Sequence, residues 1–134
     1  MVVNLLFPRG CAGCDKPDEV LCEACRALFS QPTAQSFDGV AMQRWFACGW
    51  YHGTVRRAVL AWKDHGDEEC DRAFADAICA LAKASGVIDF VRDRHGSCHD
   101  VVVVPAPSSP ASIRRRGRKH MMPVSYTHLT LPTI

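Results

Sequence analysis

The hydrophobic positions between residues 54 and 86 recur with the period of a helix. One stripe predicts a helix over residues 55–65 that Thr54 caps and Gly66 ends, and it consists of Val55, Ala58, Val59 and Trp62. A second stripe predicts another helix up to Gly86 that Asp67 caps, and it consists of Phe74, Ala77, Ile78 and Leu81. Residues 87–91 are ambiguous and fit a further helical turn. The centre of the chain is therefore expected to be two consecutive helices.

Two segments that flank these helices have the composition of strands. Residues 45–51 are rich in aromatic side chains, which predicts a strand after a connector at residues 31–43. Residues 101–104 are consecutive valines, a β-branched run typical of a buried strand in a parallel sheet. A strand, two helices and a buried strand together predict α/β organisation.

The residues after the valine run are the first candidates for ligand binding. In open α/β sheets, ligands bind beyond the carboxyl ends of the strands, and Pro107, Ser108 and Ser109 occupy that position here. The serine hydroxyls and free amides are suited to an anion. Five cations follow closely, namely Arg114, Arg115, Arg116, Arg118 and Lys119. A solvated basic turn explains the same local sequence equally well.

This basic segment, residues 114–119, also accounts for the charge of the chain. The 134 residues include 16 Lys or Arg and 14 Asp or Glu, which gives a net charge of +2. Because five of the cations lie in the basic segment, the other residues together carry a net negative charge. The positive charge of this protein is therefore a local feature.

The overall composition is that of a globular protein, with 48% hydrophobic and 22% charged residues. The apolar start, residues 2–7, is too short for the core of a signal peptide. Later apolar runs are shorter than the roughly 20 residues of a membrane span. We therefore expect a cytoplasmic protein without a membrane partner. In that compartment its eight cysteines are expected to be thiols or metal ligands, not disulfides.

Four of the cysteines form two CxxC pairs, Cys11 with Cys14 and Cys22 with Cys25. Each pair can direct two thiolates at one ion from a tight turn, and two pairs complete a tetrahedral zinc site. Gly13 is expected to permit a positive φ in the first turn. Iron, a redox dithiol and four unmetallated thiols are the alternatives. Residues 8–30 contain few large apolar side chains, so this ribbon is expected to depend on its metal and to be the first part that a chelator disorders.

The other cysteines are predicted to be structural. Cys70 and Cys79 lie on opposite faces of the second predicted helix and cannot share a metal. Cys48 lies in an apolar stretch and is interpreted as a small buried hydrophobe. His95, Cys98 and His99 are interpreted as part of an ordinary polar loop, with a minor metal cluster as the alternative.

Six segments along residues 5–123 resemble, in the same order, the competence protein ComF family. They are Leu6-Phe7-Pro8, the paired CxxC turns, Tyr51-His-Gly-Thr-Val-Arg, Leu60-Ala-Trp-Lys-Asp-His-Gly, Val103-Val-Pro-Ala-Pro-Ser-Ser and Arg116-Gly-Arg-Lys-His-Met. The Pro-Ser-Ser and Arg-Gly-Arg forms resemble actinobacterial members most. Proteins of this family join an N-terminal zinc ribbon to a type I phosphoribosyltransferase-like, Rossmann-like domain, so the resemblance implies that fold here.

The resemblance also implies roles for individual residues. The zinc ligands would be the four cysteines of the CxxC pairs. The residues beside the pyrophosphate of phosphoribosyl pyrophosphate (PRPP), which is bound with Mg²⁺, would be Pro107, Ser108 and Ser109. Arg116 and Gly117 would also belong to the substrate-binding residues and would begin the next helix. Lys63 matches a recurrent lysine of the family and is either an anion contact or a solvated helix end.

The chain departs from the family pattern in its last part. The family's PRPP-binding motif follows the Arg-Gly segment and consists of a hydrophobic strand, two adjacent acids and a Thr/Gly-rich loop, none of which is present. The uncharged residues 124–134 resemble the translated read-through of a sequencing-library adaptor, with an ordinary edge strand as the alternative. We therefore expect a zinc ribbon at residues 1–35, a partial phosphoribosyltransferase-like domain at residues 36–123 and a non-native tail at residues 124–134.

Two functions follow from the resemblance for the intact parent. The first is PRPP binding by a phosphoribosyltransferase-like protein linked to DNA uptake in natural transformation, with this truncated chain itself inactive. The second is a non-catalytic accessory factor whose zinc ribbon and basic segment bind single-stranded DNA or competence and DNA-processing proteins. The candidate anion or nucleic-acid contacts are Lys63, Arg114, Arg115, Arg118 and Lys119.

Overall fold

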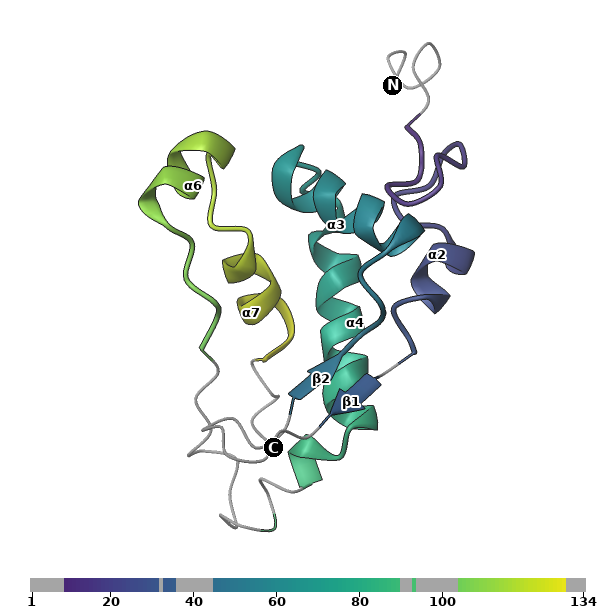
Figure 1. The fold of residues 1–134 in the computed structure, drawn as a ribbon, viewed down its shortest axis with the longest axis vertical. Helices are drawn as coiled ribbons and strands as arrows, with labels where there is room; N and C mark the ends of the chain where they lie inside the picture. Colours follow the sequence, from purple (N-terminus) through teal and green to yellow (C-terminus); the bar gives the residue numbers. More distant parts are fainter. Residues whose placement is uncertain (1–8, 32, 36–44, 90–92, 94–103, 130–134) are drawn as a thin grey trace.

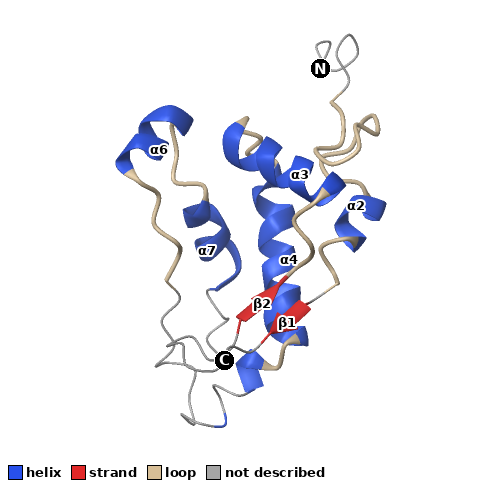
Figure 2. Cartoon of the chain, in the orientation of Figure 1, coloured by secondary structure: helices blue, strands red, loops and turns tan. Residues whose placement is uncertain are grey.

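The computed structural model describes residues 9–31, 33–35, 45–89, 93 and 104–129. Helices predominate in this part of the chain and the strands are short (Figure 2). The elements are α2 (Glu23–Ala27), β1 (Thr33–Gln35), β2 (Trp45–Ala47), α3 (Gly53–Asp64), α4 (Cys70–Ala84), α6 (Pro110–Arg116) and α7 (Met121–Leu129). Figure 1 shows α2 beside the N-terminal end of α3, and α6 and α7 on the opposite side of the molecule. None of the described helices is long and apolar enough to cross a membrane.

Helix α3 matches the first predicted helix, but its start differs. The helix begins at Gly53 with His52 as N-cap, and no side chain caps it, so the predicted cap at Thr54 is wrong. Gly53 has a φ of +50°, which lets the chain enter the helix one residue before Thr54. The predicted end is confirmed, because Gly66 has a φ of +73° directly after the C-cap His65.

Helix α4 matches the second predicted helix, and the aromatic core lies between it and α3. The predicted cap at Asp67 is wrong, because the helix begins only at Cys70 and the Asp67 carboxylate accepts hydrogen bonds from Arg9. Phe74 stacks on Trp62 at 4.7 Å and meets Phe29 edge-on at 5.2 Å. The predicted turn after Gly86 is confirmed for residues 87–89, which are helical, while residues 90–91 lie outside the described residues.

The cysteine turns and the helices share one hydrophobic core. Buried residues of the N-terminal segment form a single cluster with buried residues of α3 and α4, and the N-terminal members are Cys11, Leu21, Cys22, Cys25 and Phe29. Val124 of α7 joins the same cluster and is 3% exposed. The N-terminal ribbon is thus packed onto the helices instead of standing apart from them.

The sheet in the described part of the chain is small and antiparallel. Strand β1 pairs with β2, with Thr33 opposite Ala47 and Gln35 opposite Trp45. Residues 33–35 were expected to be a connector, and the predicted strand at residues 45–51 is confirmed only for residues 45–47. The structure therefore combines helices with little strand, and the predicted parallel sheet is not seen in the described residues.

The predicted buried strand at residues 101–104 falls mainly outside the described residues. Its last residue, Val104, is described, and the prediction is wrong for it, because Val104 is 78% exposed and belongs to no strand. Pro105 follows directly, and proline has no amide hydrogen with which to continue a ladder.

The turn between β2 and α3 is fixed against the end of α2. A Cβ atom on Gly49 would lie 2.5 Å from the carbonyl oxygen of Leu28, so the two backbones touch. The Sγ atom of Cys48 lies 3.8 Å from the carbonyl oxygen of Ala77 in α4. Contacts with the end of α2 and with α4 therefore fix this turn.

Helices α6 and α7 follow the proline-rich loop. Ser109 caps α6, because its Oγ atom accepts a hydrogen bond of 3.2 Å from the Ser112 amide, and Pro110 begins the helix. Arg116 is the last residue of α6, and Gly117 ends it with a φ of +75°. The expectation that Arg116 and Gly117 begin a helix is thus wrong, because the glycine is a C-terminal cap.

Helix α7 lies along α4 (Figure 1). It includes residues before and after position 124, where the non-native tail was predicted to begin. The alternative of an edge strand for the tail is wrong for residues 124–129, which are helical. The remaining residues of the tail lie outside the described residues.

Candidate metal centre

The four cysteines of the CxxC pairs form one cluster. Their sulfur atoms all lie within 4.8 Å of one another, and the Cys14 and Cys22 sulfurs are 3.6 Å apart. Tetrahedral zinc with Zn–S bonds of about 2.3 Å holds its sulfurs about 3.8 Å apart. The donor set and its spacing therefore fit one zinc ion with four thiolate ligands.

Two short backbone motifs bring these sulfurs together. In the first, the Asp15 amide donates to the Cys11 carbonyl at 2.9 Å, and the Cys11 amide donates to the Lys16 carbonyl at 2.9 Å. In the second, Cys22 is the N-cap of α2, so Cys25 lies in the first turn of that helix. Each motif therefore supplies the two sulfurs of one CxxC pair to the cluster.

Gly13 is required for a reason other than the one expected. The residues with positive φ in this loop are Asp15 and Asp18, at 62° and 60°. A Cβ atom on Gly13 would lie 2.7 Å from Cγ2 of Thr54 and 2.9 Å from the Cys25 sulfur. Gly13 thus allows the first turn to pack directly between Thr54 of α3 and Cys25 of α2.

The environment of the cluster favours a thiolate at Cys11. Burial raises the pKa of Cys11, but backbone hydrogen bonds, that from the Cys22 amide first, outweigh it and lower the pKa to about 6. The Cys22 amide lies 3.3 Å from the Cys11 sulfur. Burial and the neighbouring thiols raise the pKa of Cys25, so zinc binding at this cluster would have to displace the Cys25 proton.

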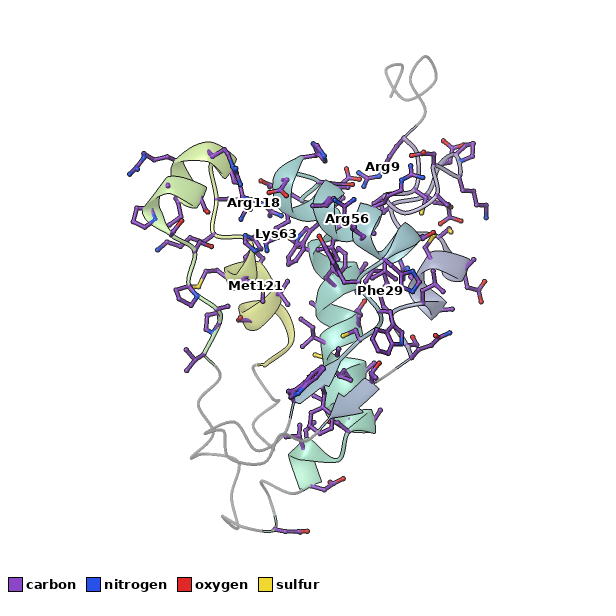
Figure 3. The ribbon with its side chains drawn as sticks, in the orientation of Figure 1. Arg9, Phe29, Arg56, Lys63, Arg118 and Met121 are labelled. Atoms are coloured by element: carbon purple, nitrogen blue, oxygen red, sulfur yellow. The ribbon has the colours of Figure 1, made fainter. Side chains whose placement is uncertain are left out.

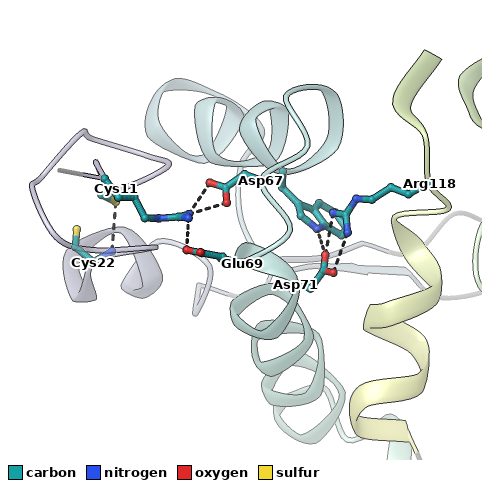
Figure 4. A network of polar contacts seen from close by, with 8 residues as sticks. Cys11, Cys22, Asp67, Glu69, Asp71 and Arg118 are labelled. Carbon is teal, nitrogen blue, oxygen red and sulfur yellow. Dashed lines mark hydrogen bonds and ion pairs between the residues drawn. The ribbon is translucent and has the colours of Figure 1, made fainter. Parts of the chain in front are cut away.

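Ion pairs connect the ribbon to the helices. Arg9 donates to both carboxylate oxygens of Asp67 at 2.6 and 2.7 Å and also pairs with Glu69. Arg57 of α3 pairs with Asp15 in the cysteine loop. Figure 4 shows Asp67 and Glu69 on the side of Cys11 and Cys22, and Asp71 with Arg118 as a separate group of contacts.

The other cysteines do not belong to this cluster. Among the described residues, the four cysteines are the one group of potential metal ligands close enough to hold an ion. Cys70 is fully buried, and burial raises its pKa to about 12, so it remains a thiol. Cys48 and Cys79 are partly buried, and Cys98 lies outside the described residues.

The basic segment divides into paired and outward-facing cations. Arg116 donates to Asp64 at 2.8 Å, and Arg118 donates to both oxygens of Asp71 at 2.9 and 3.0 Å. Their side chains are only 14% and 16% exposed. By contrast, Arg115 is 71% exposed and 3.8 Å from Asp64, and Arg114 and Lys119 are exposed as well.

The predicted anion loop precedes α6. Pro107 and Ser109 are exposed and Ser108 is half-buried. The Ser109 hydroxyl caps α6, which is a structural role. Lys63 is half-buried in the last turn of α3, and Figure 3 shows it near Arg118.

His120 is a buried polar residue that sequence reasoning did not single out. It is 5% exposed, meets Trp62 edge-on at 5.2 Å, and its Nδ1 atom has no hydrogen-bond partner among the residues that the structure describes. Burial lowers the pKa of His120, and the nearby charges of Lys63 and the paired arginines lower it further. A histidine next to a run of cations carries no sequence signal of burial.

Searches of protein-family models, curated proteins and solved structures found no match to this chain.

Proposed function

We propose that this chain is the zinc-binding N-terminal part of a ComF-family, phosphoribosyltransferase-like protein. The observation that carries the zinc site is the cluster of four cysteine sulfurs within 4.8 Å, and the family is proposed from the six ordered segments of the sequence that resemble it. Four thiolates fill a tetrahedral zinc site and leave no position for substrate, so the zinc would be structural. Its role would be to hold the ribbon on α3 and α4.

Elemental analysis of the native protein tests the zinc site directly. We expect one zinc ion per chain. Cys14→Ser should lose the metal, whereas Cys79→Ser, which lies outside the cluster, should retain it. Native protein without bound metal would contradict the proposal.

The intact parent, in this proposal, binds PRPP and takes part in DNA uptake during natural transformation in the cytoplasm. Mg²⁺ would hold the pyrophosphate, and the loop of Pro107, Ser108 and Ser109 would lie beside it. The exposure of this loop next to the basic segment supports the assignment. Calorimetry with PRPP and Mg²⁺ tests it: a chain extended with the native sequence beyond Pro123 should bind, and the 134-residue chain should not.

A second candidate function is that of a non-catalytic factor that binds nucleic acid or protein. It is favoured by the outward-facing cations of the basic segment, which suit an extended polyanion. Single-stranded DNA should bind with an affinity that falls steeply with salt. Arg114→Ala and Lys119→Ala should weaken this binding. Binding that does not depend on salt would instead indicate an uncharged partner.

A further inference from the structure

Large apolar side chains are exposed where the end of α2 meets the turn before α3. Trp50 is 62% exposed, Tyr51 is 58% exposed and Leu28 is 36% exposed. The contact between Gly49 and the Leu28 carbonyl brings the two segments together. We call Leu28, Trp50 and Tyr51 the aromatic patch.

The backbone beneath the aromatic patch is well anchored. The His52 amide donates to the Trp50 carbonyl at 2.8 Å, which makes a three-residue turn with Tyr51 at its apex. Cys48 and Gly49 hold the preceding residues against α4 and α2. The two rings are therefore exposed on a turn whose backbone is already anchored, so binding a flat partner would not require that backbone to become ordered.

The charge beside the patch is positive. Arg56 follows His52 by one helical turn, both side chains are exposed, and the first turn of α3 contains no acid. In the part of the chain that the structure describes, no acid pairs with Arg56. The nearby Asp15 is engaged by Arg57. Figure 3 shows Arg56 on the half of α3 that faces α2 and Phe29.

We propose that the aromatic patch binds single-stranded nucleic acid, with bases stacked on Trp50 and Tyr51 and a phosphate held by Arg56. Stacking tolerates any base because every base has a π face, and a neighbouring arginine supplies the attraction for the backbone. This inference rests on the second proposed function. It adds a base-binding surface at the end of α3 opposite to Asp64, which pairs with Arg116 of the basic segment.

The combination of rings and an arginine favours nucleic acid over an apolar protein partner. An apolar peptide would gain from the rings but would have to desolvate the Arg56 guanidinium without a compensating charge. A nucleic acid strand supplies both a stacking face and a phosphate. The occupant to which we commit is therefore a single-stranded nucleic acid.

Fluorescence anisotropy with a fluorescein-labelled oligothymidylate tests the proposal on the full chain with its zinc. The double variant Trp50→Ala, Tyr51→Ala should bind about tenfold more weakly or worse. The conservative pair Trp50→Phe, Tyr51→Phe should retain most of the affinity, because the phenyl rings still stack. Arg56→Ala should lower the slope of log affinity against log salt by about 1. Arg72→Ala, a change at an exposed arginine of α4, is the matched control and should change neither quantity.

Circular dichroism should show that all these variants remain folded, because the altered side chains are exposed. Unchanged affinity in the double alanine variant, with weakened binding in Arg114→Ala and Lys119→Ala, would overturn this inference and leave the second proposed function intact. Failure of the wild-type chain to bind the oligonucleotide would overturn both. Binding of a protein or peptide through the patch, without oligonucleotide binding, would also overturn the inference.

Discussion

Arg118 and Asp71 form a two-point ion pair between the segment after α6 and the first turn of α4. The guanidinium donates to both carboxylate oxygens at 2.9 and 3.0 Å, and the two side chains are only 16% and 20% exposed. The indole of Trp62 donates to the same carboxylate. One aspartate therefore links α3, α4 and the basic segment.

Replacing Arg118 should destabilise the protein. Arg118→Ala removes two charged hydrogen bonds and should lower the free energy of unfolding by about 1 to 3 kcal/mol. Arg115→Ala, at an exposed cation, should lower it by less than about 0.5 kcal/mol. Urea denaturation of both variants measures the difference. Equal stabilities would show that the Arg118 pair contributes no more than a surface contact.

Removal of the proposed zinc should destabilise the helices together with the ribbon. The sequence indicated that residues 8–30 would respond first, but three of the four clustered cysteines are buried in the same core as α3 and α4. Zinc binding supplies about 10 to 16 kcal/mol of apparent folding free energy in small zinc domains. We therefore expect a chelator to reduce helical circular dichroism and to expose the buried Trp62. Loss of zinc with an unchanged helical signal would mean that the helices fold without the ribbon.

Gly13→Ala should disturb the metal site and the start of α3 at once. The added methyl group would lie 2.7 Å from Thr54 and 2.9 Å from the Cys25 sulfur. Overpacking of this kind typically costs about 1 to 3 kcal/mol. The second change Thr54→Ser removes the nearer methyl group and should restore part of the loss. Thermal unfolding of the zinc-loaded variants measures both effects, and a double variant no more stable than Gly13→Ala would argue against this contact.

His120 should make stability depend on pH. Its pKa is lowered in the folded chain by burial first and then by Lys63, Arg116 and Arg118, with Asp64 opposing them. The unfolded chain, with a histidine pKa of about 6.5, binds the proton more readily, so stability falls as pH drops through about 6.5 toward the folded pKa.

The variant His120→Leu cannot bind this proton and should lack that part of the pH dependence. Denaturation of both proteins between about pH 5 and about pH 7.5 measures the difference between them, in which changes at the cysteines cancel. Parallel curves for the two proteins would assign the pH dependence to other groups.

The parts of the fold that sequence could predict depend on local signals. The two helices followed from apolar stripes, and the CxxC spacing was sufficient to group the four cysteines. Gly66 ended a helix as expected. The caps were predicted less well, because Gly53 allowed α3 to begin before Thr54 and Asp67 pairs with Arg9 instead of capping α4.

The remaining features depend on contacts between distant residues. Asp67 lies 58 positions after Arg9, and Arg118 lies 47 positions after Asp71. No local pattern encodes either pair, so the basic segment could be recognised but its division into paired and outward-facing cations could not. The exposure of Val104 likewise depends on what packs around it, not on its β-branched composition.

The contact between Gly49 and Leu28 has a consequence for evolution. Because a Cβ atom at position 49 would lie 2.5 Å from a backbone oxygen, no other residue fits there without moving α2. At Gly13 the space is taken by two side chains, the methyl group of Thr54 and the sulfur of Cys25, so a larger residue there would have to displace one of them. Homologues that keep this arrangement should therefore have glycine at both positions even where their helix surfaces have diverged, and the two glycines together with the four cysteines define a signature for finding them.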